Sequence, residues 1–188
     1  MKKRTLILGS PSDKQKQFLL ATERYVAYGG ARGGGKSWAV RCKAVLLALR
    51  YPGCRILILR RTLPELQENH VQPLLKVLRG IAVYNDAKKR FLFGNSSVIL
   101  CGYCMRSTDL NRYQGQEYDV IGMEEATHFT EEQMRFLTTC NRTVKPDFRP
   151  RMYYTCNPGN VGHAWVKRLF IDRAYRGREQ AEDYAFIP

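Results

Sequence analysis

The stretch YGGARGGGKSWAV, residues 28–40, lies between a short apolar run and an amphipathic one, and it decides the fold. It fits the pattern G-x-x-x-x-G-K-[ST], which forms phosphate-binding loops between a strand and a helix. Glycines permit the positive φ angles that turn successive N–H groups inward around an anion, and the helix that follows adds its positive dipole end. We therefore predict that a nucleotide's phosphates bind the residues of the pattern: Gly30, Ala31, Arg32, Gly33, Gly34, Gly35, Lys36 and Ser37.

Two side chains of this loop have separate chemical tasks. Lys36 is expected to reach the β- and γ-phosphates, and the Ser37 hydroxyl is expected to be a ligand of Mg²⁺. The competing interpretation is a flexible glycine turn with a solvated lysine. The position of the pattern between a predicted strand and a predicted helix favours the phosphate loop.

Length and charge limit what the loop can be part of. The 188 residues, 44% of them hydrophobic, are enough for one domain with a buried core. The net charge of +14 favours a polyanionic partner such as nucleic acid. No apolar run approaches the roughly 20 residues of a membrane span, and the basic start MKKRTLILGSPSDK has too short an apolar segment for a signal peptide. The composition therefore predicts a soluble intracellular protein.

The six cysteines indicate a reducing compartment, because most fall inside predicted helices and strands and not in a loop-rich disulfide framework. Cys101 and Cys104, in CGYC, form a tempting pair. A zinc site needs a second pair of ligands at similar spacing, which the sequence lacks. A redox pair opens a helix after a strand, whereas CGYC leads into a polar loop. We expect no metal or redox role for these two thiols.

Strands alternate with helices along the chain, and this alternation predicts a mainly parallel α/β sheet. In the second predicted strand the aliphatic run is nearly continuous, which is typical of a strand covered on both faces. Thr62 and Glu65 have the spacing of a capping box, and Gly94 with Asn95 marks a hairpin turn. The predicted strands are residues 24–28, 54–60, 118–123 and 151–156, the predicted helices are 36–50, 62–78 and 130–140, and the hairpin lies within 88–102.

A second carboxylate-bearing strand is needed to complete a nucleotide site, and VIGMEE at residues 120–125 supplies it. Glu124 is placed to hold Mg²⁺ through water, and Glu125 is placed to polarise the attacking water. Adjacent acids at a strand end point in different directions, so each can have its own task. The alternative is that the two acids merely begin a solvated helix. A strand, a helix and a hairpin separate Lys36 from Glu124, and this pattern suits motor ATPases better than small-molecule kinases.

Five segments together resemble the N-terminal ATPase domain of the large terminase subunit of tailed bacteriophages. They are PSDKQKQFL, YVAYGGARGGGKSWA, ILILRRTLPEL, RYQGQEYDVIGMEEATHFT and YYTCNPGNVGHAWVKRLF, and they run from Pro11 to about Phe170. The phosphate loop alone is widespread, but an arginine within it, EEATHF after the acid strand and T-x-N-P on a later strand are more specific. One departure is Glu124, because many related motors have Asp there.

The resemblance implies a P-loop NTPase fold of the additional-strand catalytic-glutamate type, with helices on both faces of the sheet. It implies that residues 1–188 are the motor domain, which hydrolyses ATP with Mg²⁺ to drive double-stranded viral DNA into a procapsid. Related proteins carry a C-terminal nuclease domain, which is not present in this chain.

The implied partners are double-stranded DNA, the portal protein of the procapsid and the small terminase subunit. The same resemblance implies a homo-oligomeric ring during packaging and a monomer in isolation. It places the protein in the host cytoplasm, soluble and transiently at the portal, with no membrane partner.

Further roles follow from the resemblance, position by position. Gln15 matches the glutamine that reads the adenine edge, although Gln17 is an alternative. Asn157 matches a γ-phosphate sensor in a coupling motif, where an ordinary Asn-Pro-Gly turn is the competing explanation. Arg32 and Arg142 are rival arginines that stabilise transition-state charge, within one subunit or across to a neighbour, and the sequence does not separate them.

Basic charge agrees with a DNA-dependent motor, with one cluster in residues 141–180 and another in KKR at 88–90. Two other classes of function remain open. One is a helicase or recombinase-like ATPase, although the chain lacks the second motor domain that many helicases use. The other is a nucleotide-binding regulator or scaffold without turnover, against which Glu125 argues.

Overall fold

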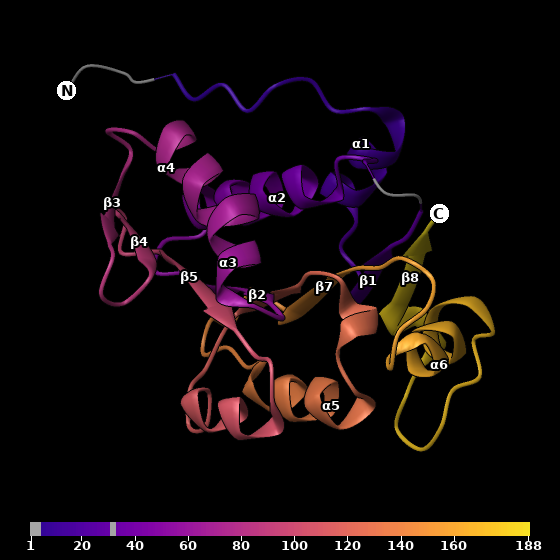
Figure 1. Ribbon diagram of the computed structural model, residues 1–188. Helices are drawn as coiled ribbons and strands as arrows, with labels where there is room; N and C mark the ends of the chain where they lie inside the picture. Colours follow the sequence, from indigo (N-terminus) through magenta and orange to yellow (C-terminus); the bar gives the residue numbers. More distant parts are fainter. Residues whose placement is uncertain (1–4, 31–32) are drawn as a thin grey trace.

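The alternating side chains of strand β2 (Arg55–Arg60) explain the layered architecture. In the computed structural model, which describes residues 5–30 and 33–188, Ile56 and Ile58 pack into one core. Leu57 and Leu59 pack into a second core on the other side of the sheet. Successive side chains of a strand point to opposite faces, so an all-aliphatic strand is buried twice. The sheet accordingly lies between two layers of helices (Figure 1).

One sheet contains all eight strands of the described residues, in the order β3-β4-β5-β2-β6-β7-β1-β8. Strands β5, β2, β6, β7, β1 and β8 are parallel, and β3 and β4 extend this sheet as an antiparallel edge. Strand β7 lies between β1 and β6, as the additional-strand type of P-loop fold requires. The remaining bounds are β1 Tyr25–Tyr28, β3 Ala82–Asn85, β4 Arg90–Phe93, β5 Val98–Tyr103, β6 Val120–Met123, β7 Arg151–Thr155 and β8 Tyr184–Ile187.

Helices near the N-terminus cover one face of the sheet, and later ones cover the other (Figure 1). Two continuous helices contain a wider π-helical segment, η1 after α3 and η4 after α6. On the first face lie α1 Asp13–Leu20, α2 Lys36–Arg50, α3 Leu63–Leu66, η1 Gln67–Val71 and α4 Gln72–Val77. On the second lie η2 Ser107–Arg112, η3 Ala126–His128, α5 Glu131–Cys140, α6 His163–Val166 and η4 Lys167–Ile171, and the short η5 Ala181–Asp183 precedes β8.

The fold predicted from the sequence is confirmed as a mainly parallel α/β sheet with helices on both faces. Helix α2 has the expected bounds, and the other expected strands and helices agree within about two residues. Besides the short 3-10 segments η2, η3 and η5, four features were not predicted: helix α1, edge strand β3, strand β8 and the helix formed by α6 and η4. Both unpredicted strands are only four residues long and mostly half-exposed, and apolar runs as short as IAVY and YAFI do not by themselves distinguish a strand from a piece of helix.

Two local predictions need correction. Thr62 stands at the start of α3, but within the described residues its side chain makes no capping hydrogen bond. Glu65 instead turns toward Arg60, with 3.7 Å between Oε2 and Nε. The hairpin between β4 and β5 exists, but four residues connect the strands, and the left-handed one is Ser96 (φ 67°). Asn95 is used elsewhere, because its Nδ2 donates to the carbonyl of Ala48 in α2 at 2.8 Å.

All six cysteines are free and buried, and in the part of the chain that is described no helix is long and apolar enough to cross a membrane. Burial raises the pKa of the Cys42, Cys104 and Cys156 thiols to about 11. It raises the pKa of Cys54 and Cys101 to about 12. These thiols therefore stay protonated in the folded protein at pH values where exposed thiols ionise.

We predict that the protein loses stability between about pH 8.5 and 10, because the unfolded chain releases thiol protons that the folded protein retains. Each such thiol contributes a loss of about 1.4 kcal/mol per pH unit above its unfolded pKa. Burial lowers the pKa of Lys43 to about 8 and also lowers the pKa of Lys36, and these two groups act in the opposite direction, but the buried thiols outnumber them. Thermal unfolding followed across this pH range measures the effect, and Cys101→Val should flatten the slope. A melting temperature that is constant from pH 8 to 10 would contradict it.

Candidate active site

The start of helix α2 shows why the phosphate loop needs its glycines. Gly35 is the N-cap residue and has a left-handed backbone (φ 68°). A Cβ atom added there would lie 2.4 Å from Nε2 of Gln15, so the position admits only glycine without a shift of the Gln15 side chain. Two expected phosphate-binding residues, Ala31 and Arg32, lie outside the described residues. The loop otherwise occupies the expected place, between the carboxyl end of β1 and the first turn of α2.

Lys36 reaches from this turn toward the end of strand β7. Its Nζ donates to the carbonyl of Gly30 at 3.1 Å and to Oδ1 of Asn157 at 2.9 Å. Burial lowers the pKa of Lys36, and the negative charges of Glu125 and Glu124 oppose that shift. The ammonium group is thus held beside the loop, on the side where the acids lie.

Glu124 connects the acid strand to the phosphate loop. Its carboxylate is completely buried and accepts a hydrogen bond from Ser37 Oγ at 2.7 Å. The same Oε2 accepts from Arg60 at 2.9 Å and lies 2.9 Å from Nε2 of His70. Burial raises the pKa of Glu124, but His70, Ser37 and Arg60 outweigh this effect and hold the pKa at about 2. The carboxylate is therefore ionised near neutral pH although no water reaches it.

Glu125 follows at a sharp backbone turn. It adopts a left-handed conformation (φ 52°, ψ 54°), which costs a residue with a Cβ atom roughly 1–3 kcal/mol. Its backbone N–H donates to Oγ1 of Thr155 at 3.0 Å, which helps to fix the turn. The Glu125 side chain is 32% exposed while that of Glu124 is buried, although the guanidinium of Arg60 contacts both carboxylates. The expectation that the two acids point in different directions is confirmed.

The loop, Glu125 and the end of strand β7 meet around one cavity of 520 Å³, which Glu124 does not line. This cavity lies outside the carboxyl ends of parallel strands, the place where α/β proteins bind ligands. Glu125 faces it, with its carboxylate 3.6 Å from Arg60 and 3.3 Å from Nε2 of His128. The expected site residues that line the cavity are Gly33, Gly34, Gly35, Lys36, Ser37, Glu125 and Asn157.

The end of β7 touches both sides of this cavity. Asn157 contacts Lys36 through its side chain, and its carbonyl accepts a hydrogen bond from Oγ1 of Thr127 at 3.0 Å. Thr155 holds the turn at Glu125. The two ends of this short segment therefore connect the phosphate loop with the acid strand.

Two further expected residues, Gln15 and Arg142, do not line this cavity. Gln15 completes a capping box at the start of α1, and its Nε2 also donates to the carbonyl of Gly35 at 3.4 Å. Both polar atoms of this amide are therefore already engaged. Arg142 donates its backbone N–H to Tyr118, which precedes β6, so it lies at the amino edge of the sheet, opposite the cavity. Its side chain pairs with Glu117 at 3.3 Å.

Sequence reasoning missed two residues that contact Glu124. Arg60 ends strand β2, and parallel neighbours β2 and β6 bring their carboxyl ends to one edge of the sheet. An arginine at the end of an aliphatic strand was therefore a usable signal. His70 lies in the π-helical segment η1, fully buried, 54 residues away from Glu124 in sequence. π-Helical turns often occur at functional sites, but no pattern in the sequence predicted this one.

The residues present fit a magnesium ion that is completed by phosphates and water. Ser37 and Glu124 offer hard oxygen atoms, and Oε1 of Glu124 is buried without a hydrogen-bond partner among the described residues. Mg²⁺ typically keeps several waters and uses one or two protein oxygens together with substrate phosphates. Within residues 5–30 and 33–188 there is no cluster of three or more His, Cys, Asp or Glu side chains that could hold a metal ion without the help of phosphates and water.

The sequence model of the phage terminase large subunit family matches residues 22–187, nearly the whole chain. The chain belongs to the phage terminase large subunit family. No curated protein sequence matches it significantly.

Solved terminase structures share the fold of this terminase chain at low sequence identity. The large terminase from a thermophilic bacteriophage superposes with a TM-score of 0.73 at 14% identity, covering 94% of this chain and 45% of its own. The same protein in complex with ATP-gamma-S gives 0.71 at 16% identity, covering 93% and 43%. The ATPase domain of the Thermus phage P74-26 large terminase gives 0.67 at 17% identity, covering 95% and 80%. The chain thus spans less than half the length of the first of these terminases.

We predict that His70 stabilises this terminase fold mainly through Glu124. His70→Leu removes a partner of a buried carboxylate and should lower the free energy of unfolding by roughly 3 kcal/mol. In a Glu124→Gln background the same change should cost clearly less, with a coupling of about 1–3 kcal/mol in the double-mutant cycle. Urea unfolding measures all four proteins, and exposed His163→Leu is the control. Equal costs in both backgrounds would show that His70 acts only by packing.

Proposed function

We propose that the chain is the ATPase motor domain of a large terminase subunit, which hydrolyses ATP to move double-stranded viral DNA into a procapsid. The observation that carries the proposal is the hydrogen bond from Ser37 to Glu124, because it joins the phosphate loop to an acid strand beside the 520 Å³ cavity. Family membership and the fold shared with terminase ATPase domains support it. On this proposal, nuclease activity belongs to a C-terminal domain outside residues 1–188.

Binding of the triphosphate is assigned to the loop. Lys36 would exchange its contacts with Gly30 and Asn157 for the β- and γ-phosphates, and the N–H groups at the start of α2 would hold the same anion. Ser37 and Glu124 would hold Mg²⁺, the latter through a water that must enter beside its buried Oε1, which has no hydrogen-bond partner in the described part of the chain. When bound, Mg²⁺ neutralises charge that develops on the phosphate oxygens.

Glu125 is assigned as the general base. Its carboxylate faces the cavity, and the left-handed turn keeps it apart from the metal-binding acid. The base takes a proton from the attacking water as the bond to the γ-phosphate forms. Arg60 and His128 lie close enough to orient the carboxylate, at 3.6 Å and 3.3 Å.

Asn157 is assigned as the sensor of the γ-phosphate. It contacts Lys36, and strand β7 just before it holds the turn at Glu125 through Thr155. With the γ-phosphate present, Lys36 would contact the phosphate. After the γ-phosphate leaves, Lys36 would return to Oδ1 of Asn157. Gln15 would read adenine only after its amide leaves Gly35.

The remaining partners follow from the same proposal. They are double-stranded DNA, the procapsid portal and the small terminase subunit, met in the host cytoplasm. Subunits would form a ring during packaging and separate into monomers in isolation. Arg32 or Arg142 would supply positive charge to the transition state, and Arg142 could do so only for a neighbour, since it lies at the opposite edge of its own sheet.

Lys36→Ala should abolish tight binding of Mg-ATP, because it removes the cation that faces the β- and γ-phosphates. Calorimetric titration of ATP into wild type and variant measures this, with circular dichroism to confirm that the variant folds. Lys14→Ala, an exposed lysine near the same end of the molecule, is the control and should bind normally. Normal ATP affinity in folded Lys36→Ala would remove the loop from the proposed site.

Glu125→Gln should still bind ATP but hydrolyse it at least about 10²-fold more slowly, because the amide keeps the shape and loses the base. Phosphate release under single-turnover conditions separates the chemical step from binding. Glu132→Gln, an acid in the first turn of α5, should leave the rate unchanged. If Glu125→Gln hydrolyses ATP at the wild-type rate, the base is another residue.

A neighbour's arginine would make hydrolysis depend on assembly. Specific ATPase activity should then rise with protein concentration, because subunits must meet to complete a site. Mixing Arg142→Ala subunits with Lys36→Ala subunits should restore part of the activity, since each supplies what the other lacks; the same test applies to Arg32→Ala. Constant specific activity and no restoration in either mixture would place the arginine within its own subunit.

A further inference from the structure

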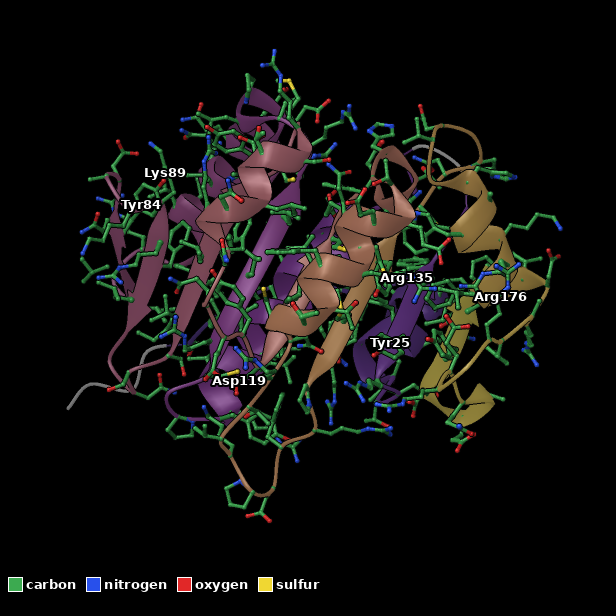
Figure 2. All side chains as sticks on the ribbon, turned by 90° about the horizontal axis from the view of Figure 1, so that it is seen from below. Tyr25, Tyr84, Lys89, Asp119, Arg135 and Arg176 are labelled. Atoms are coloured by element: carbon green, nitrogen blue, oxygen red, sulfur yellow. The ribbon has the colours of Figure 1, made fainter. Side chains whose placement is uncertain are left out.

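A second cavity, of 390 Å³, lies on the sheet face that carries α5, beneath the antiparallel edge. Figure 2 looks onto this face and shows, at the left, Tyr84 on β3 and Lys89 in the turn between β3 and β4. The cavity shares no lining residue with the 520 Å³ cavity of the active site. We call it the basic cleft after the cations that line it: Arg55, Lys88, Lys89, Arg90 and Arg112.

No Asp or Glu lines the basic cleft in the part of the chain that the structure describes. Lys89 and Arg112 pair at its rim with Asp86 and Asp109, at 2.7 and 3.1 Å. Lys88 and Arg90 have no carboxylate partner within the described residues. The lining is therefore more cationic than its two rim pairs can neutralise.

The side chain of Arg90 points away from the core on the α2 side of the sheet. Its neighbour Phe91 points into the core on the α2 side, so Arg90 points to the opposite face, into the cleft. The Nε of Arg90 is buried and finds no hydrogen-bond partner among the described residues. An unpaired buried guanidinium nitrogen is costly, and an anion in the cleft would satisfy it.

The floor and one end of the cleft are apolar or aromatic. Val98 and Leu100 form the floor, and the guanidinium of Arg112 lies 4.4 Å from the centre of the Tyr103 ring. Arg55 is held in place by the carbonyl of Glu117 and by Gln116, at 3.0 and 3.3 Å. Two arginines are thus fixed in position at the rim of a shallow trough, as contacts to successive phosphates of a polymer require.

The other basic segment of the chain, residues 141–180, is partly neutralised inside the fold. Five of its nine Lys and Arg residues form ion pairs, and within the described residues Arg151, Arg173, Arg176 and Arg178 form none. The pairs are Arg142 with Glu117, Lys145 with Asp119, Arg149 with Asp183, Lys167 with Asp172, and Arg168 with Glu131 and Glu179.

We propose that the basic cleft binds the phosphodiester backbone of DNA without reading its sequence. The proposal rests on the proposed motor function for the identity of the polyanion, and on the unpaired cations for the site. Guanidinium and ammonium groups bind phosphates whatever the bases are, as a motor that moves any DNA requires. Strand β2 carries Arg55 at the cleft and Arg60 at the active site, roughly 17 Å apart at about 3.3 Å per residue. DNA in the cleft therefore lies one strand length from Glu124.

The test measures binding of a labelled random-sequence DNA duplex to the 188-residue chain by fluorescence anisotropy at several salt concentrations. Lys88→Ala/Arg90→Ala should weaken binding at least tenfold at low salt and reduce the slope of log affinity against log salt by about 2, one unit per lost contact. The control is Lys76→Ala/Arg79→Ala, which removes the same charge from exposed positions on and just after α4, on the other face of the sheet. It should bind within about twofold of wild type.

Several outcomes overturn the proposal. Equal losses in the two double variants would show that only net charge matters, and unchanged binding in the cleft variant would leave the cleft to another ligand, such as an acidic protein. A wild-type chain that does not bind DNA also overturns it. Arg90→Lys with Lys88 intact keeps the charge and should retain most of the affinity for DNA. This variant shows whether a change at position 90 by itself disturbs the fold. ATP hydrolysis, measured separately, decides the motor function: a chain that binds DNA through the cleft without hydrolysing ATP contradicts only the latter.

Discussion

A carboxylate with no access to water is the constraint on which the rest of this site depends. An ionised Glu124 in the interior is tolerated only if hydrogen-bond donors surround it, because the desolvation of a charge costs several kcal/mol. The donors come from three separate elements: Ser37 from the first turn of α2, Arg60 from the end of β2, and His70 from the π-helical segment η1. Neutralising one charge therefore fixes the phosphate loop, a central strand and a covering helix relative to the acid strand.

The next residue, Glu125, differs from Glu124 because its side chain is partly exposed. Its backbone is held in a left-handed turn that a residue with a Cβ atom adopts only when its surroundings enforce it. The hydrogen bond to Thr155 is part of that enforcement. Two identical side chains, adjacent in sequence, thus receive different environments: one is fully buried among hydrogen-bond donors, and the other faces a cavity. Strain in the backbone is what separates them.

Periodicity and motif spacing predicted the layers, the bounds of α2 and the acids after β6, because each depends on neighbours in sequence. His70 was not predictable in that way, since its partner is 54 residues distant and no motif links them. Strands β3 and β8 are short and half-exposed, and they form only because a neighbouring strand is already present. Counting charges along the sequence singled out both residues 141–180 and KKR at 88–90, but a count does not show which cations meet an acid in the folded chain. Pairing in space, not number, leaves Lys88 and Arg90 without partners.

The burial of all six thiols has a practical consequence for following the protein in motion. Maleimide reagents attack the thiolate, and a buried, protonated thiol reacts slowly. A single cysteine placed on the exposed surface should therefore accept a dye without removal of the native ones. Val83 on the edge strand and Val161 before α6, which are 69% and 67% exposed, lie at opposite ends of the sheet and are suitable positions. Fluorescence transfer between two such dyes would report directly on changes in the width of the domain.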